Sequence, residues 1–111
     1  MVLLQADGSG CYSTAALWTQ ARESLDIVNI VCHNDRYAIL KLEQAVQRCA
    51  VGGSAARALT SIGTPQMDWV QLARGFGVQH AVRVETVGAL ADELAAALAR
   101  AGPSLIEAML P

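Results

Sequence analysis

The sequence is poor in charged and aromatic residues and in long apolar runs, and each shortage excludes a class of protein. Charged residues make up 16% of the 111 residues and hydrophobic residues 53%, a composition typical of a folded chain rather than a disordered one. Eight basic and ten acidic residues give a net charge of −2, so there is no basic excess to hold a nucleic-acid backbone. No apolar run reaches about 18 residues, so no membrane-spanning helix is expected.

The first residues and the cysteines favour a cytoplasmic protein. The chain reaches Asp7 without the basic segment and the longer apolar stretch of a signal peptide. The three cysteines, Cys11, Cys32 and Cys49, are odd in number and form no Cys-x-x-Cys pair. We therefore expect neither a disulfide framework nor a structural zinc site. The length predicts a single domain over residues 1–111. A domain of this size with so few charged residues leaves part of its apolar surface exposed. We therefore expect that surface to contact a partner chain or a second copy of this chain.

Apolar spacing alternates between strand and helix along the chain. It predicts strands at 2–5, 27–32, 79–84 and 104–110. It predicts helices at 12–23, 37–48, 68–74 and 87–98, the first capped by Ser9 or Ser13. The segment 49–66 is expected to be either a functional loop or helical over 55–59. Strands alternating with helices predict an α/β fold, a parallel sheet with helices on both faces.

Two polar clusters follow the first two predicted strands, where parallel sheets bind ligands. Asp7-Gly8-Ser9-Gly10 places glycines and a carboxylate before a helix, where free N–H groups suit a phosphate. A cation is needed between that phosphate and Asp7, and Mg²⁺ takes one or two carboxylates plus substrate phosphates. The second cluster, His33-Asn34-Asp35-Arg36, offers the Asn34 amide oxygen as a further ligand. Each cluster alone is also typical of an ordinary turn.

Taken together, the two clusters resemble the cofactor motif of thiamine diphosphate (ThDP) enzymes, Gly-Asp-Gly followed by Asn-Asn somewhat under thirty residues later. Asp7 and Asn34 lie 34 − 7 = 27 positions apart. The resemblance is to the acetolactate synthase and benzoylformate decarboxylase branch and covers essentially the whole chain. The residues that carry it are Asp7-Gly8-Ser9, Tyr12, Ala16-Leu17-Trp18-Thr19, Ala21-Arg22, Asn34, Tyr37-Ala38-Ile39-Leu40, Asp68-Trp69, Leu72-Ala73, Gly75, Gly77-Val78, Gly102-Pro103 and Leu105-Ile106-Glu107.

The resemblance implies a role for each matching position. The metal ligands would be the side chains of Asp7 and Asn34 and the backbone carbonyl of Arg36. The diphosphate would be held by Gly8, Ser9, Tyr12, Tyr37 and the backbone at Ala38 and Ile39. Core packing remains an alternative for both tyrosines, and Trp18 and Trp69 are assigned to packing.

Three positions depart from the motif. Ala6 stands where the first glycine is usual, which costs about 1–2 kcal/mol only if that position needs a positive φ. His33 replaces the first asparagine, and we expect a neutral, hydrogen-bonded imidazole there. Asp35 adds a negative charge beside an anionic ligand, which Arg36 can offset.

The resemblance also implies that half of the cofactor site lies elsewhere. In this family a different domain, usually of a second subunit, holds the aminopyrimidine ring and supplies the activating glutamate. The chain would then be the C-terminal part of a longer 2-oxo acid decarboxylase or carboligase, needing a complementary pyrimidine-binding chain or a homo-oligomer for turnover. The alternative is a non-catalytic, stand-alone relic that serves in binding or assembly. An unrelated nucleotide-binding domain is disfavoured because neither a Walker lysine nor a Gly-x-Gly-x-x-Gly turn is present.

Overall fold

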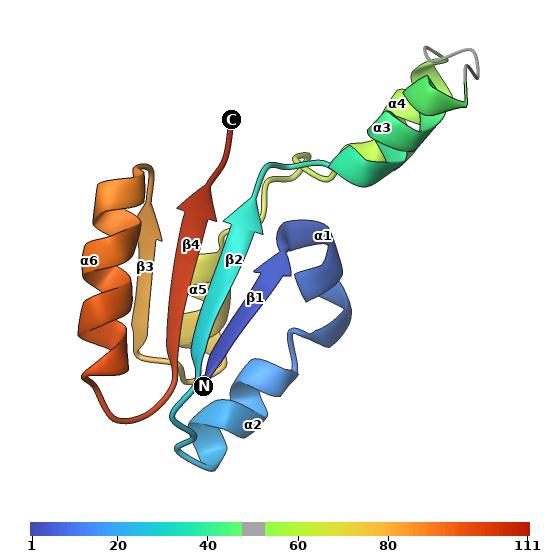
Figure 1. The fold of residues 1–111 in the computed structure, drawn as a ribbon. Coiled ribbons are helices and arrows are strands. Elements are labelled where there is room, and N and C mark those ends of the chain that lie inside the picture. Colours follow the sequence, from blue (N-terminus) through green and yellow to red (C-terminus); the bar gives the residue numbers. More distant parts are fainter. Residues whose placement is uncertain (48–52) are drawn as a thin grey trace.

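A four-stranded parallel sheet forms the centre of the molecule in a computed structural model that describes residues 1–47 and 53–111 (Figure 1). The strands are β1 (Val2–Ala6), β2 (Val28–His33), β3 (His80–Val84) and β4 (Ser104–Met109), and their spatial order is β1-β2-β4-β3. All three neighbouring pairs are parallel. The central strands β2 and β4 are buried almost throughout, which explains their nearly continuous apolar sequences.

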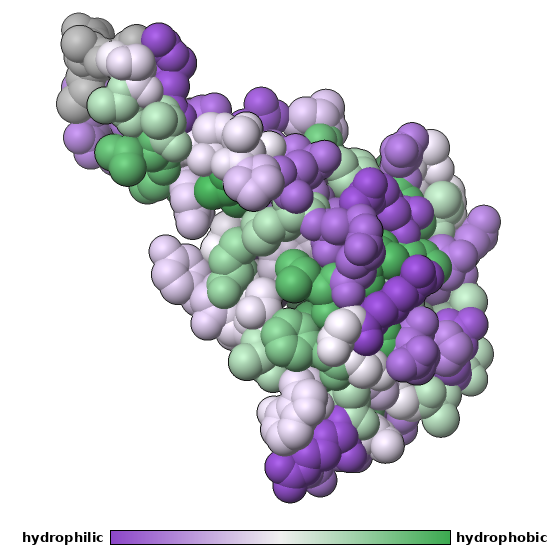
Figure 2. All heavy atoms as spheres, turned by 180° about the vertical axis from the view of Figure 1, so that it is seen from behind, coloured by the Kyte–Doolittle hydropathy of each residue, from purple (hydrophilic) through white to green (hydrophobic). Residues whose placement is uncertain are grey.

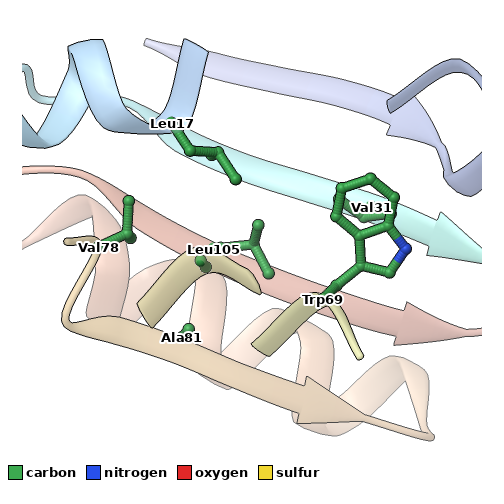
Figure 3. Close-up of a cluster of buried hydrophobic side chains, with 7 residues drawn as sticks. Leu17, Val31, Trp69, Val78, Ala81 and Leu105 are labelled. Carbon is green, nitrogen blue, oxygen red and sulfur yellow. The ribbon is translucent and has the colours of Figure 1, made fainter. Parts of the chain in front are cut away.

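Helices connect the strands and cover both faces of the sheet, as the sequence predicts. The helices are α1 (Asp7–Gly10), the 3₁₀ turn η1 (Cys11–Ser13), α2 (Ala16–Arg22), α3 (Ala38–Val46), α4 (Ser54–Thr60), α5 (Trp69–Gly75) and α6 (Val87–Leu98). Successive strand residues point to opposite faces, so neighbours such as Leu105 and Ile106 enter different cores. Leu105 packs with Leu17 of α2 and Trp69 of α5 (Figure 3), whereas Ile106 packs with Ala97 of α6.

Three local predictions need correction. Asp7–Gly10 is a short helix rather than a glycine turn, and α2 begins at Ala16 instead of residue 12. Neither Ser9 nor Ser13 caps α2, because the Ser9 hydroxyl bonds the Ala6 backbone and Ser13 lies inside η1. The helical alternative for the segment 49–66 is confirmed, because helix α4 spans Ser54–Thr60, while residues 48–52 lie outside the described part of the chain.

Helices α3 and α4 stand away from the sheet and its covering helices (Figure 1). No residue of α3 is buried, and Figure 2 shows hydrophobic side chains on this pair of helices. Ile39, Leu42 and Val46 of α3 are 60–69% exposed, and Leu59 of α4 is 78% exposed. Throughout residues 1–47 and 53–111, no helix combines the length and the apolar character that a membrane span requires.

Candidate functional site

The sheet topology brings the two polar clusters together. β1 and β2 are neighbours with Ala6 opposite Cys32, so the residues after each strand meet at the same edge. Asp7 is only 1% exposed, and its Oδ1 accepts a hydrogen bond from the Gly8 N–H at 2.8 Å. Its Oδ2 accepts the N–H groups of Asn34 at 3.0 Å and Asp35 at 2.7 Å. The two halves of the motif are therefore joined directly through this carboxylate.

The three predicted metal ligands offer a uniform set of oxygen donors. The Asn34 Oδ1 accepts the Arg36 N–H at 3.2 Å, and the Arg36 carbonyl accepts the Ala38 N–H at 3.0 Å. A carbonyl oxygen has two lone pairs, so one hydrogen bond leaves each of these oxygens able to bind a cation. Carboxylate, amide and carbonyl oxygens are the ligands that Mg²⁺ prefers, so the residues present fit this ion.

Two tyrosines lie over the first turn after β1. A Cβ at Gly8 would collide with the Cε1 of Tyr37, so any other residue there would force that ring to move. The hydrogen bond between Tyr37 and Tyr12 raises the pKa of Tyr37, and the negative charge of Asp7 adds to this shift. Tyr12 is 85% exposed, which excludes core packing as its role in this structure. The predicted diphosphate residues Gly8, Tyr12 and Tyr37 thus lie together beside Asp7.

The other predicted diphosphate groups are placed less directly. The Gly8 N–H is donated to Asp7, and the Ser9 hydroxyl donates to the Ala6 carbonyl at 3.0 Å, so each must exchange a partner to bind phosphate. Ala38 and Ile39 open helix α3, and both are exposed. Ala6 has a φ of −86°, so this position does not need glycine and the departure from the motif carries no backbone cost.

A buried histidine links the site to the centre of the sheet. His33 and Glu107 are both 0% exposed, and the His33 Nδ1 lies 2.5 Å from the Glu107 Oε1. The His33 Nε2 lies 2.7 Å from the Asp35 Oδ1, and the Arg83 Nε donates to the Glu107 Oε2 at 2.8 Å. Asp7, His33 and Asp35 form a cluster whose ligand atoms lie within 4.8 Å of one another.

The charge of His33 differs from the sequence prediction. Burial by itself lowers the pKa of His33, but the hydrogen bonds to Asp35 and Glu107 outweigh it and raise the pKa above its ordinary value. The predicted hydrogen bonding is confirmed, whereas the predicted neutral form is disfavoured because both ring nitrogens face carboxylates. The negative charge of Asp35 is paired with His33 and not with Arg36, because the Arg36 guanidinium donates to the Pro111 carbonyl.

Sequence reasoning gave no role to Glu107 or Arg83. Glu107 is the only charged residue in the buried strand β4, and a buried charge of this kind requires a partner. That signal was present in the sequence, but nothing local identifies His33, 74 positions away, as the partner.

The structure separates the two tryptophans. Trp69 is 2% exposed and packs in the core as predicted, with its ring against Gly10. Trp18 is 51% exposed and lies under the Arg22 guanidinium, 5.3 Å from the ring centroid, so its assignment to packing is wrong.

The cysteines occupy different surroundings. Cys11 is exposed as a residue and its thiol contacts the Asp7 carbonyl, and the partial burial of the thiol together with the nearby Asp7 charge raises its pKa. Cys32 is free and half-buried, and Cys49 lies outside the described residues.

Known proteins resemble this chain over nearly its whole length. Residues 1–108 match the family model described as "Thiamine pyrophosphate enzyme, C-terminal TPP binding domain". A Mycobacterium tuberculosis protein that bears the name acetolactate synthase large subunit IlvX is 42% identical over 114 residues, which cover all of this chain and 22% of that protein.

Solved structures agree with this match. The ThDP-dependent 4-hydroxybenzoylformate decarboxylase of Rhodococcus jostii RHA1 is 29% identical with a TM-score of 0.82, covering 96% of this chain and 19% of that one. The benzoylformate decarboxylase of Polynucleobacter necessarius is 25% identical with a TM-score of 0.85, covering 98% and 19%. The chain therefore spans about a fifth of the length of these relatives.

Proposed function

The chain belongs to the family of thiamine pyrophosphate enzyme C-terminal TPP binding domains, and from this premise we propose that it holds the diphosphate of ThDP through a Mg²⁺ ion. Asp7, Asn34 and the Arg36 carbonyl would bind the ion. Gly8, Ser9, Tyr12, Tyr37 and the start of α3 at Ala38 and Ile39 would surround the diphosphate. Residues 1–111 would act as one domain of a decarboxylase or acetolactate synthase-like carboligase.

The observation that carries this proposal is the position of Asp7. Its buried carboxylate accepts backbone N–H groups from both sides of the 27-residue interval, so it is held in one orientation before any ligand arrives. A rigid carboxylate beside an amide oxygen lowers the entropy lost when a cation and a diphosphate bind together.

Each residue of the site has a limited task. When bound, ThDP supplies the carbanion chemistry, and the protein supplies binding, orientation and electrostatics. Asp7 and Asn34 would orient the cation, and the Tyr37 ring would keep water away from Gly8. The described site contains no group assigned to activating the cofactor ring, so turnover on a 2-oxo acid would need a complementary pyrimidine-binding polypeptide. The apolar side chains of α3 and α4 offer a surface for that polypeptide or for a second copy.

Thermal unfolding with Mg²⁺, with ThDP and with both tests the proposal. A ligand at about 100 times its Kd adds about 2.7 kcal/mol, which corresponds to roughly 10 °C or more in a domain of this size. We expect this increase only when both ligands are present. Asn34→Ala should abolish it, because it removes one predicted ligand and disturbs a single hydrogen bond to the Arg36 N–H.

Gln79→Ala is the matched control. It also removes an amide side chain, but just before the third strand, at the opposite end of the sheet. Its ligand-induced shift should equal that of the wild type. A wild-type chain that shows no shift at millimolar Mg²⁺ and ThDP would refute unaided binding and favour the non-catalytic, stand-alone module.

A further inference from the structure

We propose that His33 is a positioning residue for the metal site: by bridging Glu107 and Asp35, it holds the turn at 34–36 in the conformation that directs the N–H groups of Asn34 and Asp35 toward Asp7. The expected effect of His33 on metal binding rests on the proposed function. The bridge itself is observed in the structure and needs no ligand.

Asp35 adopts an unusual backbone conformation at the centre of this turn. Its φ is +57°, in the left-handed region that, apart from glycine, chiefly asparagine and aspartate adopt. In this conformation the N–H groups of Asn34 and Asp35 both reach the Asp7 Oδ2, while the Asp35 carboxylate points to the His33 Nε2. Asp35 thus connects the histidine to the carboxylate proposed as a metal ligand.

His33 itself is fixed from the other side. It is the last residue of β2, and its Nδ1 contacts Glu107 on the central strand β4. The second Glu107 oxygen is held by Arg83 of β3. The ring cannot turn without losing one of its two carboxylate contacts, and being 0% exposed it has no water to replace them. Rigid strands therefore determine where the turn lies.

Asp35 has further contacts that limit its motion. The Gln66 Nε2 donates to the Asp35 Oδ2 at 2.9 Å, and the Ile62 N–H donates to the Asp35 carbonyl at 2.9 Å. A Cβ at Gly63 would come within 2.8 Å of the Asp35 Cβ. The residues after α4 pack closely on the outer side of the turn, and His33 supports its inner side.

Two substitutions at His33 test its contacts with Glu107 and with Asp35 separately. In His33→Asn the amide nitrogen stands near the position of Nδ1 and keeps a donor for Glu107, but cannot reach Asp35. In His33→Gln the amide nitrogen stands near the position of Nε2 and keeps a donor for Asp35. We expect His33→Asn to raise amide hydrogen exchange at Asn34 and Asp35 about tenfold in the metal-free chain, and His33→Gln to restore most of the protection.

Binding of Mn²⁺ in the presence of ThDP, measured by water-proton relaxation, gives the second readout. Loss of a residue that orients metal ligands typically weakens metal binding about 10–100-fold, and we expect a loss in this range for His33→Asn. Asp35→Gly should give a similar loss, because glycine adopts the same φ but lacks the carboxylate. It serves as a second test if His33→Asn does not fold.

The outcomes separate the inference from the proposed function. Unchanged exchange at Asn34 and Asp35 in His33→Asn, or full Mn²⁺ affinity in Asp35→Gly, would overturn the positioning role. So would direct coordination of Mn²⁺ by the His33 ring, seen as the hyperfine coupling of a directly bonded ¹⁵N in the electron spin resonance of ¹⁵N-histidine-labelled protein. If the wild-type chain binds no Mn²⁺ but the two amides still respond, the turn is positioned by His33 and the proposed function fails.

Ile106→Val is the control for general loss of stability. Ile106 precedes Glu107 on β4 but packs in the other core, against α6. It should speed exchange across the whole sheet without a selective effect at Asn34 and Asp35. If His33→Asn also speeds amide exchange uniformly across the sheet, His33 contributes only to general stability, and the inference is contradicted.

Discussion

At the scale of single residues, the space around a glycine determines whether a substitution there destabilises the protein. Gly8 lies under the Tyr37 ring, whereas a Cβ at Gly88, in helix α6, would have no neighbouring atom within 4 Å. The same chemical change at these two glycines therefore meets opposite surroundings. Ala6 shows the converse, since its φ of −86° makes alanine acceptable where the family motif has glycine.

Gly8→Ala should destabilise the chain by roughly 1–3 kcal/mol, because the added methyl group forces the Tyr37 ring to move. Gly88→Ala should instead stabilise it by up to about 1 kcal/mol, because alanine is the better helix former. Urea unfolding measures both. In a Tyr37→Ala background the cost of Gly8→Ala should largely disappear, and an undiminished cost there would contradict the proposed contact.

At the scale of elements, side-chain caps determine where two helices begin. The Asp68 Oδ1 accepts the Gln71 N–H at 2.9 Å at the start of α5, and the Thr86 hydroxyl accepts the Ala89 N–H at 3.1 Å at the start of α6. The two caps have the same geometry but only one is ionisable. Hydrogen bonds from the Gln71 backbone and then its side chain lower the pKa of Asp68.

Asp68→Ala and Thr86→Ala should each cost about 1 kcal/mol at neutral pH. Because the folded-state pKa of Asp68 is lowered, its ionised form adds stability above the ordinary pKa of 3.8, and this addition is lost as the pH falls through the lowered value. The cost of Asp68→Ala should therefore shrink in acid, whereas that of Thr86→Ala should not change. Urea unfolding between neutral pH and acid distinguishes the two, and parallel pH profiles would be inconsistent with the ionised cap.

At the scale of the whole molecule, exposed apolar side chains lie on α3 and α4, which stand off the sheet (Figures 1 and 2), and also on the edge strand β1. Leu42 and Leu59 are 60% and 78% exposed there. Val87 is exposed to a similar degree, 84%, but lies at the start of α6, outside this pair of helices. A contiguous apolar surface favours association, whereas scattered apolar residues do not.

Leu42→Glu combined with Leu59→Glu should reduce self-association, because it places two charges on the proposed docking helices. Val87→Glu, which adds a charge elsewhere, should leave association unchanged. Light scattering during size-exclusion chromatography gives the mass of each species. A wild-type chain that remains monomeric at high concentration would contradict self-association through this surface.

Patterns close together in the sequence determined the elements and half of the site. The apolar runs of β2 and β4 are long enough to identify buried parallel strands, and polar residues follow β1 and β2 at once, so the meeting of Asp7 with Asn34 was predictable from the sequence. Only the tertiary structure decided what supports that meeting. The sheet order places β4 beside β2 and brings Glu107 to His33 across 74 positions, a pairing that no local pattern encodes because it depends on how the strands are arranged in space.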